Sequence, residues 1–152
     1  MTRKYIDVGL LVIRLGLGPM FVFHGLPKLM AGGQTWDMLG SNMSYFGLTT
    51  HHYYWGLAAA ITEMLGGLLL ILGIAFRPAA AGLFAVMAVA VTMHLRQDGA
   101  AWFQTASHAI EAAIVFAGLA ITGPGELRIR VRPKAAQKPK LPHQDEIDNL
   151  QA

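Results

Sequence analysis

The chain has 152 residues, of which 54% are of hydrophobic types and only 14% are charged, and its mean hydropathy is +0.43. Because soluble domains carry about 25% charged residues, this composition excludes an ordinary soluble domain and favours one membrane-embedded domain. The net charge of +3 does not indicate nucleic-acid binding, and the lack of cysteine excludes disulfide exchange and thiolate metal sites.

Four apolar stretches approach the length of about 20 residues that a helix needs to cross a hydrocarbon core of about 30 Å. They cover residues 6–30, 54–76, 79–95 and 107–122, and the fourth can begin as early as Trp102. The first follows Arg3 and Lys4 as in a signal peptide, but Arg14 interrupts it, so we expect a retained helix. The sequence therefore predicts an all-α fold, an integral membrane four-helix bundle, with a tight turn at Arg77 and Pro78.

The basic residues outside the spans predict the orientation of the bundle. They cluster before the first span, between the second and third, and after the fourth, whereas the opposite loops hold only Arg96. The positive-inside rule then places both termini in the cytoplasm, in a multi-pass protein of the bacterial inner membrane. An aromatic belt is expected at the outer boundary, formed by Trp36, Tyr53, Tyr54, Trp55 and Trp102.

Residues 1–126 are expected to form the transmembrane domain, and residues 127–152 a basic, flexible cytoplasmic tail. The first outer loop, residues 31–53, is apolar for a loop and predicts a short interfacial helix over the mouth of the bundle. The alternative is a surface loop that contacts lipid head groups. His51 and His52 in this loop are expected to be solvated.

Charged side chains within the spans are the first candidates for function, because each central charge costs about 3 kcal/mol on an insertion scale. They are Arg14, Lys28, Glu63 and Glu111. Counted at 1.5 Å per residue from the two faces, Arg14 and Glu63 lie within about 5 Å of one level, so an Arg14–Glu63 pair is feasible. Such a pair would serve either as a structural brace or as part of a ligand site.

The same count places five titratable residues in the outer half of the bundle, namely His24, Lys28, His94, His108 and Glu111. Helical spacing brings His24 next to Lys28 and His108 next to Glu111. We expect proton transfer by Glu63, His24 and Glu111. Ligand or cofactor contacts are expected from Arg14, His24, Lys28, His94 and His108. His94 and His108 can instead simply hydrogen-bond at the interface. Less favoured alternatives are iron or zinc held by His94, His108, Glu63 and Glu111, and haem between two of the histidines. No metal site is predicted, because these residues match no closed ligand motif.

Five short motifs follow one another along the chain: R-L-G-L-G at residues 14–18 with F-H-G-L-P-K at 23–28, T-E-M-L-G-G-L-L-L-I-L-G at 62–73, R-P-A-A-A at 77–81, H-A-I-E-A-A at 108–113 and G-P-G at 123–125. In this order and spacing they resemble the DoxX family of small bacterial membrane proteins, over about residues 6–126. The resemblance implies a four-helix membrane bundle. It also implies a redox setting, since some members are membrane subunits of thiosulfate:quinone oxidoreductase and others are linked to quinone or oxidative-stress functions.

The first functional hypothesis is a membrane subunit that binds quinone in the outer half of the bundle and, if it is an enzyme, belongs to a quinone-dependent oxidoreductase of the thiosulfate type. Its expected partners are the lipid bilayer, an oxidoreductase subunit that supplies electrons, and a second copy of the chain. The alternative is a non-enzymatic membrane anchor or assembly factor for a partner oxidoreductase. A small-solute transporter is a third reading, which the absence of a sequence repeat disfavours.

Overall fold

The computed structural model describes residues 3–129, so most of the predicted tail, residues 130–152, lies outside the described residues. Every regular element within the described residues is a helix, as predicted. Its elements are α1 (Arg3–Met30), α2 (Gly33–Gly40), η1 (Ser41–Phe46), α3 (His52–Leu72), α4 (Phe76–Gln97), η2 (Gly99–Ala101) and α5 (Trp102–Thr122). Four of them are long and apolar enough to cross a membrane, namely α1, α3, α4 and the stretch Gly99–Thr122 that contains α5.

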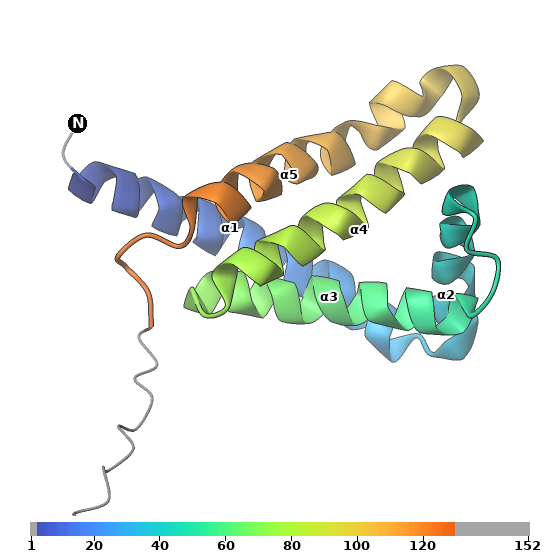
Figure 1. Ribbon diagram of the computed structural model, residues 1–152, viewed down its shortest axis with the longest axis horizontal. Helices are drawn as coiled ribbons and strands as arrows, with labels where there is room; N and C mark the ends of the chain where they lie inside the picture. Colours follow the sequence, from blue (N-terminus) through green and yellow to red (C-terminus); the bar gives the residue numbers. More distant parts are fainter. Residues whose placement is uncertain (1–2, 130–152) are drawn as a thin grey trace, which may run out of the picture.

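The long helices pack as two close pairs, α1 with α3 and α4 with α5, and α3 and α4 join the pairs through a short turn (Figure 1). One end of the bundle, here called the loop end, carries α2, η1 and the connection from α4 to α5 (Figure 1). The opposite end, here called the terminal end, carries the start of α1, the α3–α4 turn and residues 123–129 (Figure 1). The two ends of the described chain therefore lie on the same side of the bundle, as four spans require.

The turn between the second and third spans differs from the sequence prediction. Helix α3 ends at Leu72, and the chain reverses over residues 73–75 rather than at Arg77 and Pro78. Gly73 caps the C-terminus of α3 in the left-handed conformation, with φ of 70°, which glycine adopts at little steric cost. Pro78 lies in the first turn of α4, as expected of a residue that lacks an amide donor.

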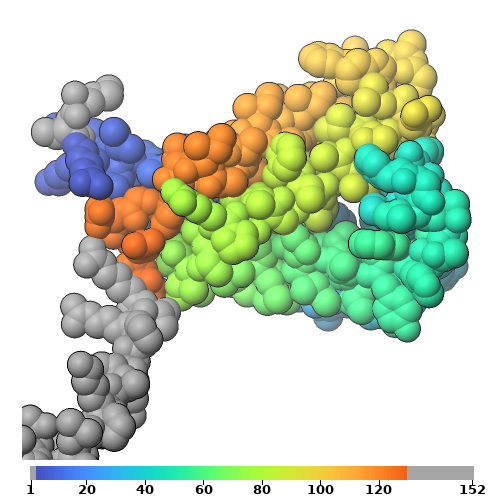
Figure 2. Space-filling view, in the orientation of Figure 1, coloured from blue at the N-terminus to red at the C-terminus, as the bar shows by residue number. Residues whose placement is uncertain are grey.

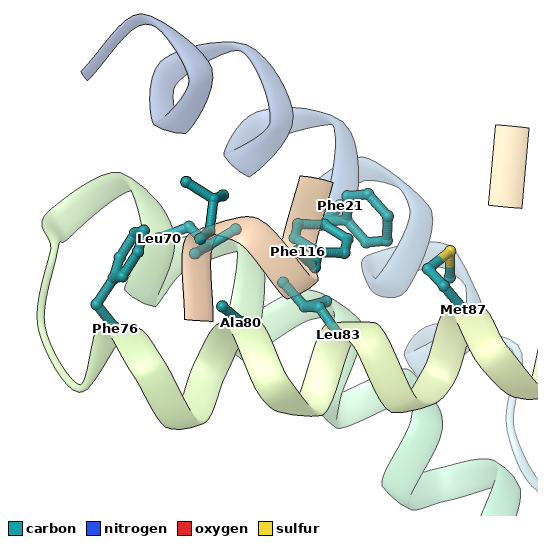
Figure 3. Packing of buried hydrophobic residues seen from close by; sticks show 8 residues of the cluster. Phe21, Leu70, Phe76, Ala80, Leu83, Met87 and Phe116 are labelled. Atoms are coloured by element: carbon teal, nitrogen blue, oxygen red, sulfur yellow. The ribbon is translucent and has the colours of Figure 1, made fainter. Parts of the chain in front are cut away.

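The core is small and receives side chains from all four long helices (Figure 3). Its residues on α3, α4 and α5 lie toward the terminal end of the bundle. Phe21 of α1 and Phe116 of α5 meet edge to face, with ring centroids 4.7 Å apart. Leu70 of α3 and Leu83 of α4 are fully buried beside them. This contact between phenylalanine rings links α1 to α5 across the bundle.

Many large apolar side chains point away from the core. Phe23, Ile114 and Ile121 are 73%, 67% and 77% exposed. Exposed apolar surface on this scale is unusual for a protein in water and is what helices present to lipid tails. The surface pattern therefore agrees with the hydropathy of the four long helices.

Helices α1 and α3 approach closely because glycines face each other at their contact. A methyl group added to Gly67 would come within 2.6 Å of the Gly18 carbonyl oxygen. Gly66 turns instead toward α4, where an added methyl group would come within 2.9 Å of Leu83. A methyl group on Gly16 would meet nothing within 4 Å, so Gly18, Gly66 and Gly67 lie at close helix contacts and Gly16 does not.

The first loop contains a helix, α2, as the sequence predicts, followed by the 3-10 helix η1. Helix α2 packs against the start of α3, where the Trp36 and Tyr53 rings lie 5.2 Å apart, edge to face. The five aromatic residues expected at the outer boundary all lie in elements of the loop end. The interfacial position of α2 and the aromatic belt stay predictions.

Candidate functional site

An ion pair between α1 and α3 is the central polar feature of the bundle. Lys28 Nζ donates to both carboxylate oxygens of Glu63, at 2.8 Å from Oε1 and 2.6 Å from Oε2. The Glu63 side chain is 3% exposed and that of Lys28 is 33% exposed. Because a carboxylate this deeply buried is costly without a partner, Lys28 is what allows Glu63 to be charged here.

Two features of the backbone hold this ion pair in place. Gly25, one turn before Lys28, faces α3 so closely that an added methyl group would come within 2.9 Å of Glu63 Cβ. Trp36 of α2 donates its Nε1–H to the Lys28 carbonyl oxygen at 2.9 Å. The end of α1 is thereby fixed against both α3 and the loop helix.

A cavity of about 470 Å³ opens beside the ion pair, between α3, α4 and the loop elements. Figure 2 shows a hollow bounded by α2, α3 and α4 at this place. Most lining residues are small or apolar, and its polar residues are Lys28, Asn42, Thr62, Glu63 and His94. An apolar-walled cavity of this size with a few convergent polar groups has the character of a small-molecule site.

His94 reaches this cavity from the last turn of α4 and is held by a carboxylate. Its Nδ1 lies 2.6 Å from Asp98 Oδ2, and Thr105 Oγ1 donates to the same carboxylate oxygen at 2.5 Å. Since a carboxylate only accepts hydrogen bonds, Nδ1 must carry the proton, which leaves Nε2 of the neutral ring as an acceptor. Hydrogen bonds from Thr105 and His94 hold the pKa of Asp98 below its usual value.

Sequence reasoning missed Asp98 and Thr105. The spacing of His94 and Asp98, four residues apart near the end of a predicted span, is the signal that would have found the first of them. Thr105 lies in another helix, so only the packing of α5 on α4 reveals it.

The loop elements are tied to α4 over this cavity. Gln97 Nε2 donates to the Tyr45 hydroxyl at 3.0 Å and contacts Asn42 Oδ1 at 3.5 Å. Asn42 and Met43 of η1 line the cavity together with Leu39 and Gly40 of α2. The first loop therefore forms one wall of the site rather than a separate surface feature.

Arg14 lies at the other end of the bundle, where its hydrogen bonds to the described residues all go to backbone carbonyl groups and its guanidinium carbon lies 5.7 Å from the centroid of the Phe76 ring. Its Nε and Nη2 donate to Leu70 and Ile71 in the last turn of α3, each at 2.8 Å. Its Nη1 donates to Pro124 at 3.1 Å and Leu127 at 2.5 Å, in the segment that follows α5. The side chain is buried, and it donates to carbonyl groups in the last turn of α3, where the intrahelical bonding pattern ends, and in the segment after α5.

The Arg14–Glu63 pair that the depth count made feasible is therefore wrong. Gly25 faces Glu63 across the helix contact, and Arg14 lies eleven residues earlier, or roughly 16 Å along the axis at 1.5 Å per residue. The depth count failed because it fitted both helices to a slab of about 30 Å, whereas α1 has 28 residues and is longer than such a slab. Arg14 is a brace, but for three backbone segments rather than for Glu63.

The other predicted site residues lie outside the cavity lining. The exposed His24 ring donates from Nδ1 to the Met20 carbonyl oxygen at 2.8 Å. His108 and Glu111 lie 4.0 Å apart on α5, with side chains 95% and 74% exposed. The roles expected of these three residues stay predictions, and the structure unites only Lys28, Glu63 and His94 from the predicted set.

The arrangement of the cavity groups determines what chemistry they can perform. Lys28 donates two of its three N–H groups to Glu63, so one N–H can be donated to a ligand. His94 offers an acceptor when neutral and a donor when protonated, and Asp98 fixes its ring in either state. Within residues 3–129, no three His, Asp or Glu side chains gather as a metal site would require.

Comparison with known proteins adds the family. Searches of curated proteins and of solved structures found no match to the chain. A family model described as DoxX matches residues 9–95, which is more than half of the 152 residues and includes Lys28, Glu63 and His94. With four helices apolar enough to span a membrane, the chain is a multi-pass membrane protein that belongs to the DoxX family.

Proposed function

We propose that the cavity between α3 and α4 binds the head group of a quinone and that the protein is the quinone-binding membrane subunit of an oxidoreductase. The observation that carries this proposal is the convergence of Lys28, Glu63 and His94 on one apolar-walled cavity of about 470 Å³. A quinone ring needs apolar walls for its faces and hydrogen-bond partners for its two oxygen atoms. The cavity offers both.

The chain's own residues suit the proton steps of quinone chemistry. Lys28 would donate its remaining N–H to one ring oxygen, and this hydrogen bond would favour a charge developing there. His94 would give a proton to the other ring oxygen, or take one from it, while Asp98 keeps the imidazole oriented. Reduction of a quinone to a quinol takes two electrons and two protons, and the electrons would come from a reduced substrate or a partner subunit.

The test is extraction of the detergent-purified protein with organic solvent, followed by mass spectrometry for quinones. We expect about one quinone per chain in the wild type and a clear loss in His94→Asn. The matched control is His51→Asn, since the His51 ring is exposed and its left-handed backbone suits asparagine. The His108→Asn variant should keep its quinone, because His108 was a predicted site residue but does not line the cavity.

A second function, that of a membrane anchor or assembly factor, is favoured by one observation. Both oxygens of Glu63 are already bound by Lys28, so the pair is complete as a structural brace without any ligand. If no quinone copurifies with the wild type, and if Glu63→Gln changes only the melting temperature, this second function replaces the first.

A further inference from the structure

A second cavity, of about 480 Å³, lies at the terminal end of the bundle. Its walls come from the α3–α4 turn, the first turn of α4 and the residues that follow α5. Arg77 and Arg128 line it, from segments far apart in the sequence, and both are exposed. No carboxylate lines this cavity within the described part of the chain.

Arg14 adds a third guanidinium group behind the wall of this cavity. Gly73 lines the cavity, and a methyl group added there would come within 2.5 Å of Arg14 Nη2 and 2.8 Å of Arg128 Cβ. The four hydrogen bonds of Arg14 use four of its five N–H donors. Among residues 3–129, the donor without a partner belongs to Nη2, the atom beside Gly73.

Among the described residues, no carboxylate balances the buried charge of Arg14. The residue is 1% exposed, and its partners between residues 3 and 129 are all neutral, namely four carbonyl groups and the ring of Phe76 at 5.7 Å. Carbonyl groups satisfy its donors but supply only partial negative charge. A buried cation balanced in this way gains from an anion nearby.

Two described carboxylates at the terminal end, Asp7 and Glu126, make contacts at the start of α1. Asp7 Oδ1 accepts the backbone N–H of Glu126 at 2.9 Å, and the Glu126 carboxylate lies 3.9 Å from Arg3. Neither carboxylate lines the cavity with Arg77 and Arg128. Among the described residues that line this cavity, the charged side chains are therefore those of Arg77 and Arg128 alone.

We propose that this cavity binds a phosphate group, that of an anionic membrane lipid. Guanidinium groups bind phosphate oxygens bidentately and stay charged at any working pH. The cavity lies where apolar helices end, which is the depth at which lipid head groups meet a membrane protein. Inorganic phosphate has the same binding chemistry, so the test separates the two sources.

The experiment is native mass spectrometry of the full-length protein in detergent, titrated with phosphatidylglycerol or with phosphatidylcholine. We expect at least tenfold tighter binding of phosphatidylglycerol. The double substitution Arg77→Gln, Arg128→Gln should weaken that binding by about tenfold or more. The control Lys4→Gln, Arg96→Gln removes the same charge outside the cavity, and its binding should stay within about twofold of wild type.

Two further arms decide the source and guard against misfolding. The double substitution Arg77→Lys, Arg128→Lys keeps the charge but loses the bidentate geometry of the guanidinium groups. Its affinity for phosphatidylglycerol should fall between that of the wild type and that of the Arg77→Gln, Arg128→Gln variant. If bound phosphatidylglycerol stays on the protein when millimolar inorganic phosphate is added, the ligand of the cavity is the lipid head group. If inorganic phosphate displaces the lipid, the cavity is a site for free phosphate. Equal binding of the two lipids, or equal losses in the cavity variant and its charge-matched control, would overturn the proposal.

Discussion

Buried charges in this bundle are satisfied in two different ways. Glu63 is balanced by a charged partner, Lys28, through two short hydrogen bonds. Arg14 is balanced by backbone carbonyl groups at the end of α3 and after α5. The first arrangement lies beside the apolar-walled cavity of about 470 Å³, whereas the second ties α1 to the end of α3 and to the segment after α5, at the terminal end.

Removing one partner of the Lys28–Glu63 pair should cost more than removing both. Lys28→Met leaves the Glu63 carboxylate buried without a counter-charge, and we expect a loss of about 3 kcal/mol of stability, the low end for a broken buried pair because Lys28 is partly exposed. Glu63→Leu together with Lys28→Met removes both charges and should restore most of that loss. Melting temperatures in detergent of the two single variants, the double variant and the wild type measure this coupling. Additive losses would contradict the pairing.

The pH dependence of stability should report the Asp98 carboxylate. Because hydrogen bonds from Thr105 and His94 lower its pKa in the folded state, folding is favoured most when this group is ionised. That contribution is complete above the unfolded pKa of about 3.9 and is lost as the pH falls through the lower folded value. Thr105→Val removes the largest cause of the shift, so its melting temperature should fall less steeply than that of the wild type below about pH 4. Identical slopes would contradict the assignment.

At the level of helices, glycine decides how closely α1 and α3 pack and therefore where the ion pair forms. Gly18 and Gly67 meet at one point along the contact, and Gly25 meets Glu63 at another. These contacts fix the register of the two helices. The register in turn places Lys28, rather than Arg14, beside Glu63.

Gly25→Ala should disturb this register, because its new methyl group would come within 2.9 Å of Glu63 Cβ. We expect a loss of about 1–3 kcal/mol, as for other overpacked cores. Gly16→Ala is the matched control, since a methyl group there meets nothing within 4 Å and alanine favours helix by up to about 1 kcal/mol. Thermal unfolding of both variants in the same detergent checks the difference, and equal melting temperatures would show that α1 can shift freely.

Hydropathy predicted the elements well, because a helix that meets lipid must be apolar along its whole length. The four long helices and the helix in the first loop were all expected. Their ends were less predictable. The left-handed Gly73 ends α3 several residues before Arg77 and Pro78, and nothing in that glycine's sequence context distinguishes it from the glycines inside helices.

The candidate site was harder to predict, because its partners come from different helices. Counting residues from each membrane face placed Arg14 at the level of Glu63. Such a count takes no account of the register between α1 and α3, or of backbone carbonyl groups as partners for a buried arginine. His94 was found because it is a rare polar residue in an apolar span. Asp98 and Thr105 lie at the loop end, where polar residues are ordinary, and only packing shows their contact with His94.

The whole molecule has two polar ends of different character around an apolar middle. The loop end carries the cavity with Lys28, Glu63 and His94, and the terminal end carries the cavity with Arg77 and Arg128. Both ends of the described chain lie at the terminal end of the bundle (Figure 1). The positive-inside rule predicts that this arginine-rich end faces the cytoplasm.

Thiol labelling tests that orientation cleanly, since the chain has no cysteine of its own. Lys4→Cys and Thr49→Cys each introduce one exposed thiol, the first at the terminal end and the second at the loop end. In intact bacterial cells an impermeant maleimide should label Thr49→Cys and leave Lys4→Cys unlabelled until the membrane is opened. The reverse pattern would invert the orientation.

Quenching of Trp55 fluorescence tests the central proposal most directly, because Trp55 lines the cavity that we assign to quinone. A short-chain quinone titrated into the protein in lipid vesicles should quench tryptophan emission with saturation. Most of that quenching should vanish in Trp55→Phe, and His94→Asn should need a higher quinone concentration to reach it. Quenching that rises linearly without saturation, or that is unchanged in both variants, would show that quinone partitions into the bilayer and does not occupy this cavity.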